Sequence, residues 1–347
     1  MNPKFILPIA LCLAFCPTPA RAAFINGRNY TPITTWARSI GLRCLQLKRG
    51  NEIIATNSTT RLVFDANSHY AEINGVQVAL SFPVANDKGV VLVSQFDLDT
   101  TIRPLLFSGR YVAPKAIRTI CLDPGHGGRD TGNHTFWHSE KTYTLALASE
   151  LRDQLQKAGF NVILTRTKDI YVELPDRPAL ANRRGADLFV SLHFNATETG
   201  RSEVEGPETY CITPVGTSST NARGEGSDYG PTTANRFEQR SLLFAYQLEK
   251  SLVQNLGVED RGVRRARFAV LRDAAMPAIL IECGYMTHPA EGKKIYDAVY
   301  RRQMAQAIVK GILAYQKLTS PPVPPVVLTT NKPVAHSKKV SSSKGSP

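Results

Sequence analysis

The sequence predicts an α/β protein, in which a layered domain with a largely parallel sheet follows a small β-rich domain. Three observations lead to this fold class. The chain has 347 residues, more than one small domain needs, and 42% of them are hydrophobic, enough for a sizeable core. Residues 24–107 contain the short alternating runs of strands. From residue 117 onward, apolar strand-like runs alternate with helical patterns, which is typical of parallel sheets covered by helices.

Residues 1–22 have the layout of a secretory signal peptide. A lysine precedes an apolar stretch over residues 5–15 and a small-residue cleavage site at residues 20–22. The stretch is shorter than the ~20 residues of a transmembrane helix. The alternative, a buried N-terminal helix, is disfavoured by Pro8 and Pro17. We therefore expect an exported protein of the periplasm, cell envelope or extracellular space, with no transmembrane segment in the mature chain.

The net charge of +13 would suit nucleic acid, an anionic membrane or an anionic polymer. Export argues against a nucleic-acid partner and favours a polymer of the cell wall. Four cysteines follow the signal peptide and form no CxxC pair, so they predict neither a metal motif nor a redox motif; they are Cys44, Cys121, Cys211 and Cys283. The compartment allows a disulfide, but the sequence assigns none.

The β-rich part, residues 24–107, shows strand alternation over 76–80 and an apolar run over 90–93. Residues 30–41 are typical of a short helix that ends at a glycine. This part loosely resembles the small N-terminal domain of copper amine oxidases and of many exported bacterial proteins. The resemblance implies no copper chemistry, and we expect a targeting role. Residues 108–116 are expected to form a linker.

The second domain is expected over residues 117–318. Its predicted elements are strands at 117–122, 160–165, 187–193 and 278–282, and helices at 139–158, 177–184, 237–256 and 291–317. A stretch rich in Gly, Ser and Thr near 213–233 is predicted to be a mobile loop. The basic, Pro- and Ser-rich residues 319–347 are predicted to be a disordered tail.

Three polar side chains lie at strand ends or at a helix start, where open α/β sheets place their sites. His126 lies in a glycine-rich turn after the first strand, Glu140 in the first turn of a helix, and His193 at the end of an apolar strand. Two histidines and one carboxylate are a common ligand set for catalytic zinc, with the fourth position left to water. The wide spacing of His126 and Glu140 excludes the HExxH arrangement on one helix.

A fourth residue, Glu282, lies near the end of the apolar strand 278–282. An ionisable side chain there is costly unless it has a partner or a role. Beside an activated water, this carboxylate could take the proton and later deliver it to a leaving amine. Each residue alone also fits a structural histidine, a carboxylate favoured by a helix start, or half of a buried ion pair. Their occurrence together in one domain weakens those interpretations.

The flanking sequences extend this constellation into a set of motifs. They are DPGHGG at 123–128, EK at 140–141, LTR at 164–166 followed by Leu174, Arg177, Ala181 and Asn182, ADLFVSLHFNA at 186–196, ETY at 208–210, RGV at 261–263, FAVLR at 268–272 and PAILIECGYMTHP at 277–289. With them, the segment from about 117 to 315 resembles the zinc-dependent N-acetylmuramoyl-L-alanine amidase family, amidase type 3. The motifs are specific and span nearly the whole second domain.

This resemblance implies a mixed, largely parallel sheet wrapped by helices. It implies that His126, Glu140 and His193 bind Zn²⁺ and that Glu282 is the catalytic glutamate. The implied reaction is hydrolysis of the amide between N-acetylmuramic acid and L-alanine in peptidoglycan, for wall remodelling, turnover or daughter-cell separation. Zinc would polarise the carbonyl and activate the attacking water.

Some members of the family carry a helical insert that blocks the site until an activator binds. The corresponding loop near 213–233 lacks apolar periodicity, so we do not expect this autoinhibition, and any activator is unidentified. His134 and His138 do not match the ligand motifs and are interpreted as loop or substrate-side residues. Asn195, Arg264 and Arg267 are candidate contacts to the glycan or to peptide carboxylates; a solvated surface role remains equally open for both arginines.

Two alternatives stay open. One is a zinc peptidase that cuts the peptide cross-links, because the same ligands would serve it and the choice of the muramoyl amide depends on the resemblance. The other is a non-catalytic wall-binding or activator protein, which would be expected to have lost a ligand or the glutamate. All four residues are present, which favours an enzyme.

Overall fold

The computed structural model of the chain describes residues 22–47, 51–135, 137–220 and 230–320. Residues 1–21 of the predicted signal peptide and residues 321–347 of the predicted tail lie outside the described residues, as does the middle of the predicted 213–233 loop. Within the described part, no helix combines the length and the hydrophobicity that crossing a bilayer requires. Cys44, Cys121, Cys211 and Cys283 are free thiols.

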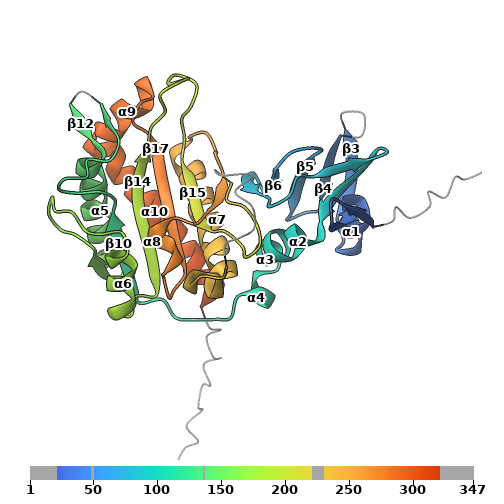
Figure 1. Ribbon diagram of the computed structural model, residues 1–347, viewed down its shortest axis with the longest axis horizontal. Coiled ribbons are helices and arrows are strands. Elements are labelled where there is room, and N and C mark those ends of the chain that lie inside the picture. The colour runs from blue at the N-terminus through green and yellow to red at the C-terminus, as the bar shows by residue number, and fades with distance from the viewer. Residues whose placement is uncertain (1–21, 48–50, 136, 221–229, 321–347) are drawn as a thin grey trace, which may run out of the picture.

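An eleven-stranded sheet organises the described chain (Figure 1). Its order is β13 (Asn161–Leu164), β10 (Thr119–Pro124), β14 (Leu188–Asn195), β17 (Ala278–Tyr285), β15 (Glu208–Ile212), β16 (Val263–Ala266), β7 (Val76–Ala79), β6 (Tyr70–Ile73), β5 (Arg61–Asp65), β4 (Glu52–Thr56) and β3 (Arg43–Leu47). The first four strands are mutually parallel, β15 is antiparallel to β17, and β16 is parallel to β15. The predicted mixed, largely parallel sheet is therefore confirmed.

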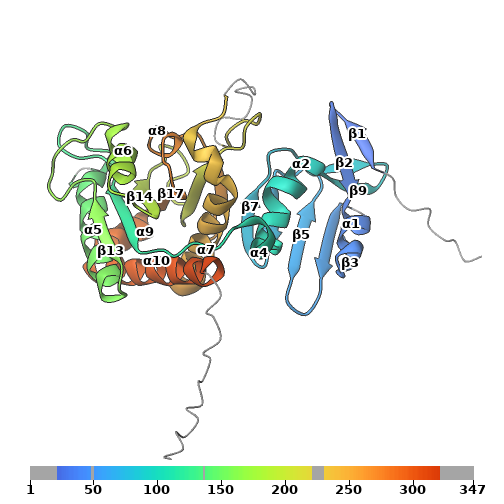
Figure 2. The ribbon, with the colours of Figure 1, turned by 90° about the horizontal axis from the view of Figure 1, so that it is seen from below.

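The sequences of the central strands are continuous apolar runs because helices cover both faces of the sheet. On one face, Leu122, Val190 and Ile281 belong to the core formed with α5 (Glu140–Lys157), α7 (Glu238–Leu256) and α10 (Ala298–Thr319). On the other face, the alternate residues Cys121 and Phe189 pack with α6 (Asp176–Arg183) and α8 (Ala269–Arg272). Figure 2 shows these two helical layers on either side of the strands. Packing on both faces thus fixes the positions of the carboxyl ends of these parallel strands.

The predicted elements of the second domain are present with shifted ends, with one correction. The single helix expected at 291–317 is wrong, because the chain forms two helices, α9 (Pro289–Tyr296) and α10. Asp297 separates them: its backbone is extended, with φ −82° and ψ 130°, and its Oδ1 accepts the N–H of Tyr300 at 2.8 Å. This side-chain cap starts a new helix where the sequence pattern continues. The short strands β15 and β16 were not predicted.

The N-terminal part is rich in strands, as expected. A four-stranded sheet has the order β1 (Ala23–Ile25), β2 (Arg28–Pro32), β9 (Val90–Ser94) and β8 (Ala85–Asp87), beside helix α1 (Ile33–Ser39). Short helical segments follow at α2 (Gln95–Asp97), η2 (Leu98–Ile102), α3 (Arg103–Leu106) and α4 (Ser108–Tyr111). Tight turns at Asn74-Gly75 and Asn26-Gly27 have positive φ at both residues, which Asn-Gly pairs adopt readily in hairpins.

The two parts of the chain share the large sheet. Strand β7 pairs in parallel with β16 through Val78 and Val263, so the N-terminal strands extend the sheet of the second part. Asp260 Oδ2 accepts the N–H of Gln77 at 2.6 Å across this joint. The hydroxyl of Tyr246 donates to the carbonyl of Ile73 at 2.9 Å. The division into two domains and a linker stays a prediction, and helix α4 occupies the start of the predicted linker.

Candidate metal centre

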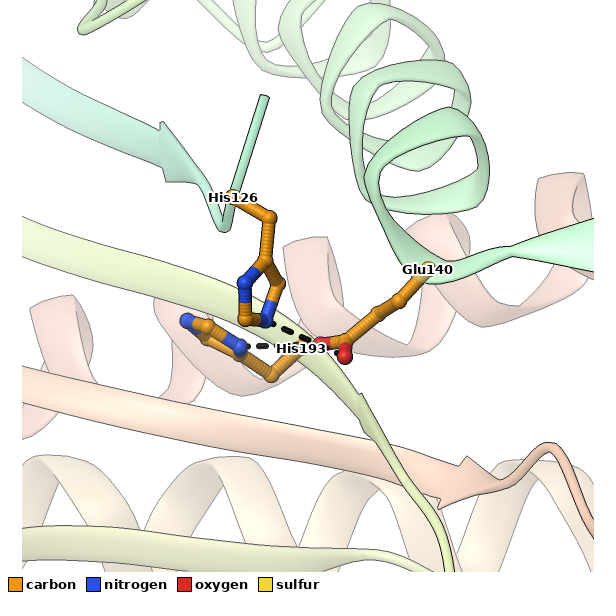
Figure 3. A group of neighbouring side chains, drawn as sticks. All are labelled: His126, Glu140 and His193. Carbon is orange, nitrogen blue, oxygen red and sulfur yellow. Dashed lines mark hydrogen bonds and ion pairs between the residues drawn. The ribbon is translucent and has the colours of Figure 1, made fainter. Parts of the chain in front are cut away.

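The three predicted ligands converge at one edge of the sheet (Figure 3). His126, Glu140 and His193 each offer a ligand atom, and these atoms lie within 4.8 Å of one another. Nε2 of His126 lies 3.1 Å from Oε2 of Glu140, and Nδ1 of His193 lies 2.9 Å from Oε1. The two imidazoles meet edge to face, at 80°. The group could therefore hold a metal ion, whereas its zinc ligation stays a prediction.

The topology explains this convergence. Strands β10 and β14 are parallel neighbours, and Pro124 is paired with Leu192 at their carboxyl ends. His126 follows the end of β10 by two residues, and His193 lies near the end of β14. Both histidines therefore lie at the carboxyl ends of neighbouring parallel strands. Glu140 is the first residue of α5, which packs on these strands. Residues far apart in the sequence are thus delivered to one point by regular elements.

Two buried arginines hold the turn that carries His126. Arg166 donates to the carbonyl oxygens of Pro124 at 3.0 Å and Gly125 at 2.8 Å. Arg177 donates to Pro124 and His126 carbonyls and to the carboxylate of Asp123, at 2.9 Å. His126 itself has a φ of +60°, which is uncommon for a residue with a Cβ. These hydrogen bonds stabilise a backbone conformation that the histidine alone would rarely adopt.

The other nitrogen of His126 is also engaged. Nδ1 lies 2.8 Å from Oδ2 of Asp130, a carboxylate that itself accepts the N–H of Gly132 at 3.0 Å. Carboxylates thus lie at both ring nitrogens, and once an ion took the place of the proton on Nε2, Asp130 would keep the remaining proton on Nδ1. Asp130 therefore orients the first predicted ligand. The sequence alone indicates no role for Asp130, Arg166 or Arg177.

The glycines around the centre leave room for the imidazole rings. A Cβ added to Gly125 would lie 2.3 Å from Cε1 of His193. A Cβ added to Gly132 would lie 2.5 Å from Cδ2 of His126 and 2.6 Å from Oε2 of Glu140. Any larger residue at either position would displace a predicted ligand. The glycine-rich motif thus serves the packing of the centre as well as its turn.

The side chain of Glu140 is buried, and both of its carboxylate oxygens accept hydrogen bonds. Besides the two imidazoles, its carboxylate accepts the N–H groups of Asn133 at 2.8 Å and Phe194 at 3.1 Å. Burial would raise the pKa of Glu140, but the hydrogen bonds from His126 and His193 outweigh burial and hold this pKa below its usual range. An ionised carboxylate with two imidazole nitrogens matches the ligand preference of Zn²⁺. The donor set therefore fits such an ion.

Glu282 lies in β17, directly opposite His193 of β14 and Glu208 of β15. Its Oε2 is buried and has no hydrogen-bond partner among the residues that the structure describes. Burial, and then the negative charges of Glu140 and Glu208, raise the pKa of Glu282 well above its ordinary value. This carboxyl group can hold a proton next to the three-ligand centre, as a general acid and base must.

Glu208 was part of a predicted motif, but without a role. It is buried and accepts hydrogen bonds from the hydroxyls of Tyr210 and Tyr285, both at 2.6 Å, and from Nε of Arg261 at 2.7 Å. Arg264 Nε lies 3.5 Å from it. Its carboxylate is thus a fixed negative charge beside Glu282. A charged residue at the start of an otherwise apolar segment was the signal that could have identified it.

The remaining candidate residues have hydrogen-bond partners within the protein. Asn195 ends β14, and its Oδ1 accepts the N–H of Ala196. Arg264 donates to the carbonyl of Arg261 besides its ion pair, and Arg267 donates to the carbonyls of Pro214 and Thr217. Their predicted contacts to substrate stay predictions. His134 and His138 lie on a hairpin and are not part of the three-ligand group.

Comparison with known proteins agrees with this geometry. The N-acetylmuramoyl-L-alanine amidase family matches residues 120–314. The chain is 34% identical over 218 residues to N-acetylmuramoyl-L-alanine amidase AmiC of Neisseria meningitidis, covering 56% of this chain and 52% of that protein. It is 32% identical over 204 residues to LytC of Bacillus subtilis, an amidase of the same description, covering 59% and 36%.

The chain thus spans about half or less of the length of these two relatives. A solved N-acetylmuramoyl-L-alanine amidase from Clostridium difficile 630 is 35% identical, with a TM-score of 0.49 over 58% of this chain and 98% of that one. The family match covers more than half of the chain and contains all four residues of the centre, His126, Glu140, His193 and Glu282. The chain therefore belongs to the N-acetylmuramoyl-L-alanine amidase family, amidase type 3.

Proposed function

We propose that this protein is a zinc-dependent N-acetylmuramoyl-L-alanine amidase that cuts peptidoglycan. The bond it hydrolyses is the amide between the lactyl group of N-acetylmuramic acid and the first L-alanine of the stem peptide. The observation that carries this proposal is the juxtaposition of three convergent ligands with the buried carboxyl group of Glu282. Membership of the amidase family supports the choice of bond.

The three ligands have separate tasks in this proposal. Nε2 of His126, Nδ1 of His193 and the carboxylate of Glu140 would hold the ion. A bound zinc ion would supply Lewis acidity, which polarises the amide carbonyl and lowers the pKa of the attacking water. Because Glu140 already has hydrogen bonds from Asn133 and Phe194, the carboxylate is oriented before the ion binds.

Glu282 performs the proton transfers. Its carboxylate takes a proton from the attacking water and delivers it to the amine nitrogen of the departing L-alanine. The raised pKa, caused first by burial and then by the charges of Glu140 and Glu208, favours the protonated form that the second transfer needs. A metal ion held by the three ligands would act in the opposite direction and favour the ionised form that the first transfer needs.

The substrate implies the place of action. The predicted signal peptide would export the chain to the periplasm, the cell envelope or the outside, where peptidoglycan lies. A relative described as probable cell wall amidase LytH, from Staphylococcus epidermidis, is 34% identical over 201 residues and supports this location. The proposed processes are wall remodelling, turnover or daughter-cell separation. The N-terminal part, with its own strands, would position the enzyme on its substrate.

The test is digestion of purified peptidoglycan by the zinc-loaded mature chain, with fragments identified by mass spectrometry. Release of stem peptides that begin with L-alanine, together with glycan strands that have lost their peptides, is the expected result. Cleaved cross-links with intact muramoyl amides would instead identify a zinc peptidase. Binding to the wall without any cleavage, by a chain shown to contain its metal, would identify a non-catalytic protein.

A further inference from the structure

A small hairpin lies beside the metal centre and has no part in the mechanism above. Strand β11 (His134–Thr135) pairs with β12 (His138–Ser139), between the first two predicted ligands in the sequence. Its base is bonded to the centre: the N–H of Glu140 donates to the carbonyl of Asn133, and the N–H of Asn133 donates to the Glu140 carboxylate, both at 2.8 Å. The hairpin is therefore fixed to a predicted ligand.

Aromatic side chains hold the stem of this hairpin in place. The imidazole of His138 stacks on the ring of Tyr296, with 3.7 Å between ring centroids and 17° between planes. Its Nδ1 is hydrogen-bonded to the hydroxyl of Tyr143, from α5. On the other strand, the hydroxyl of Thr135 lies 3.4 Å from that of Tyr296, at the end of α9. The stem is thus packed between two helices.

The turn of the hairpin carries Trp137, and this side chain is 91% exposed. It is the most exposed of the large hydrophobic residues in the part of the chain that the structure describes. A solvent-exposed tryptophan on a rigid backbone is typical of binding surfaces, where tryptophan side chains are enriched among the residues that dominate the binding free energy. Trp137 borders an open depression of about 440 Å³, lined also by Thr131, His134, Thr135, His138 and Ser139.

We propose that Trp137 and this depression form a subsite for a sugar ring of the glycan strand. The inference deepens the proposed amidase function and depends on it. The scissile amide is joined to a lactyl group carried by the muramic acid sugar, so glycan must lie close to the centre during the reaction. The hairpin is bonded directly to Glu140, which places its surface beside that reacting bond.

The chemistry of the depression matches a sugar ring. One face of a pyranose presents C–H groups, which pack on an aromatic plane, while its hydroxyls extend sideways to polar partners. Trp137 supplies the aromatic plane, and the side chains of Thr131 and Ser139 and the imidazole of His134 supply hydroxyls and ring nitrogens around it. The described lining residues include no Asp, Glu, Lys or Arg, so the depression offers no ion-pair partner of that kind for the charged groups of a stem peptide.

The test compares Trp137→Ala and Trp137→Phe with wild type on two substrates. One is a long soluble glycan strand that carries stem peptides, and the other is a single N-acetylmuramic acid joined to the peptide. For Trp137→Ala we expect KM on the long strand to rise on the order of tenfold with kcat unchanged, since an aromatic anchor that becomes buried on binding contributes about that factor or more. Trp137→Phe keeps the ring and should stay within about threefold of wild type.

Val299→Ala is the matched control, because Val299 is an apolar side chain 56% exposed on α10; its kinetics should be those of wild type. A KM for Trp137→Ala equal to that of wild type on the long strand overturns the subsite. So does a loss of kcat alone, which indicates a structural role. A wild-type dimer that Trp137→Ala dissociates, with KM unchanged, would assign the tryptophan to a second copy of the chain.

Calorimetry on the zinc-loaded chain measures its affinity for peptide-free glycan strands, and so tests the subsite without hydrolysis. Weaker binding by Trp137→Ala than by wild type supports the subsite, and equal binding overturns it. If wild type releases no L-alanine peptides from peptidoglycan, the proposed amidase function fails on that result alone. The two failures are therefore distinguishable.

Discussion

The carboxylate of Asp130 is hydrogen-bonded to Nδ1 of His126, 2.8 Å away, while Nε2 of the same ring faces Glu140. This arrangement orients the ring, and it would keep a proton on Nδ1 when an ion binds at Nε2. Because partners of this kind orient metal-binding histidines, Asp130→Ala should weaken zinc affinity by about 10–100-fold. Competition with a chromophoric chelator measures the change. Asp153→Ala, which removes an exposed acid on α5, is the control. Unchanged affinity in Asp130→Ala would mean that the ring is oriented without the carboxylate.

Gly125 is expected to tolerate no side chain. The Cβ of Gly125→Ala would lie 2.3 Å from the His193 ring, so the imidazole must move away from Glu140. We expect a large loss of bound zinc, measured by metal analysis of the purified protein. Gly109→Ala is a matched control, because the space around Gly109 is open and its φ is not positive. Full zinc occupancy in Gly125→Ala would show that His193 is dispensable.

Replacement of Glu282 should separate metal binding from catalysis. Glu282→Gln keeps the shape of the side chain but cannot accept the proton of the attacking water. We expect hydrolysis to fall by about 10²–10⁴-fold while zinc content stays unchanged. The release of L-alanine peptides and metal analysis measure the two effects. Glu150→Gln, on α5, should behave as wild type. Retained hydrolysis in Glu282→Gln would remove this residue from the mechanism.

The buried pair of Arg177 and Asp123 should matter for stability. Their side chains are 1% and 0% exposed, and Asp123 also accepts the hydroxyls of Thr165 and Ser191. Arg177→Ala leaves a buried charge without its partner, so we expect a loss of about 3–5 kcal/mol in the free energy of unfolding. Urea denaturation measures it. The surface pair of Arg129 and Glu173 is the comparison, and Arg129→Ala should cost at most about 1 kcal/mol.

A buried acid, Glu249, and a half-buried acid, Asp260, lie near the joint between β7 and β16 and predict a pH dependence of stability. Oε1 of Glu249 and Oδ1 of Asp260 are buried, and neither has a hydrogen-bond donor among the described groups unless the two share a proton. Burial raises the pKa of both acids, and that of Glu249 well above its ordinary value. Above pH of about 4.3, the folded state thus binds more protons than the unfolded state. The free energy of unfolding should fall as pH rises toward the raised pKa of Glu249.

Glu249→Gln tests this pH dependence, because the amide donates a hydrogen bond at every pH. Urea midpoints measured between about pH 5 and 8 should decline for wild type and stay flatter for Glu249→Gln. Glu259→Gln, at an exposed position nearby, should follow wild type. Parallel curves for wild type and Glu249→Gln would show that the pair does not set the pH dependence.

The convergence of the three candidate ligands was predictable because each lies at or close to the end of a strongly patterned element. His193 lies near the end of an apolar strand and Glu140 starts an amphipathic helix, so the topology of parallel strands brings them together. The roles of Asp130 and Arg177 were not predictable. One lies in a turn and the other in a short helix, and their partners are backbone and side-chain atoms that only the folded chain places nearby.

Strand β16 and the break at Asp297 could not be predicted from the sequence, for local reasons. Strand β16 is four residues long and contains Arg264 and Arg265, so its sequence lacks the apolar run of a buried strand. Its strand conformation depends on pairing with β15 and β7. The break at Asp297 was missed because the helical pattern continues on both sides, and one capping side chain decides where the second helix starts.

The pairing of β7 with β16 has a practical consequence for work with the isolated catalytic part. A fragment that starts after residue 107 would remove β7 and leave the backbone N–H and C=O groups along one side of β16 without strand partners. Such an open edge invites edge-to-edge association with a second molecule. The N-terminal strands thus act as a covering for that edge. Their removal should give a protein that self-associates more strongly than the full chain as its concentration rises.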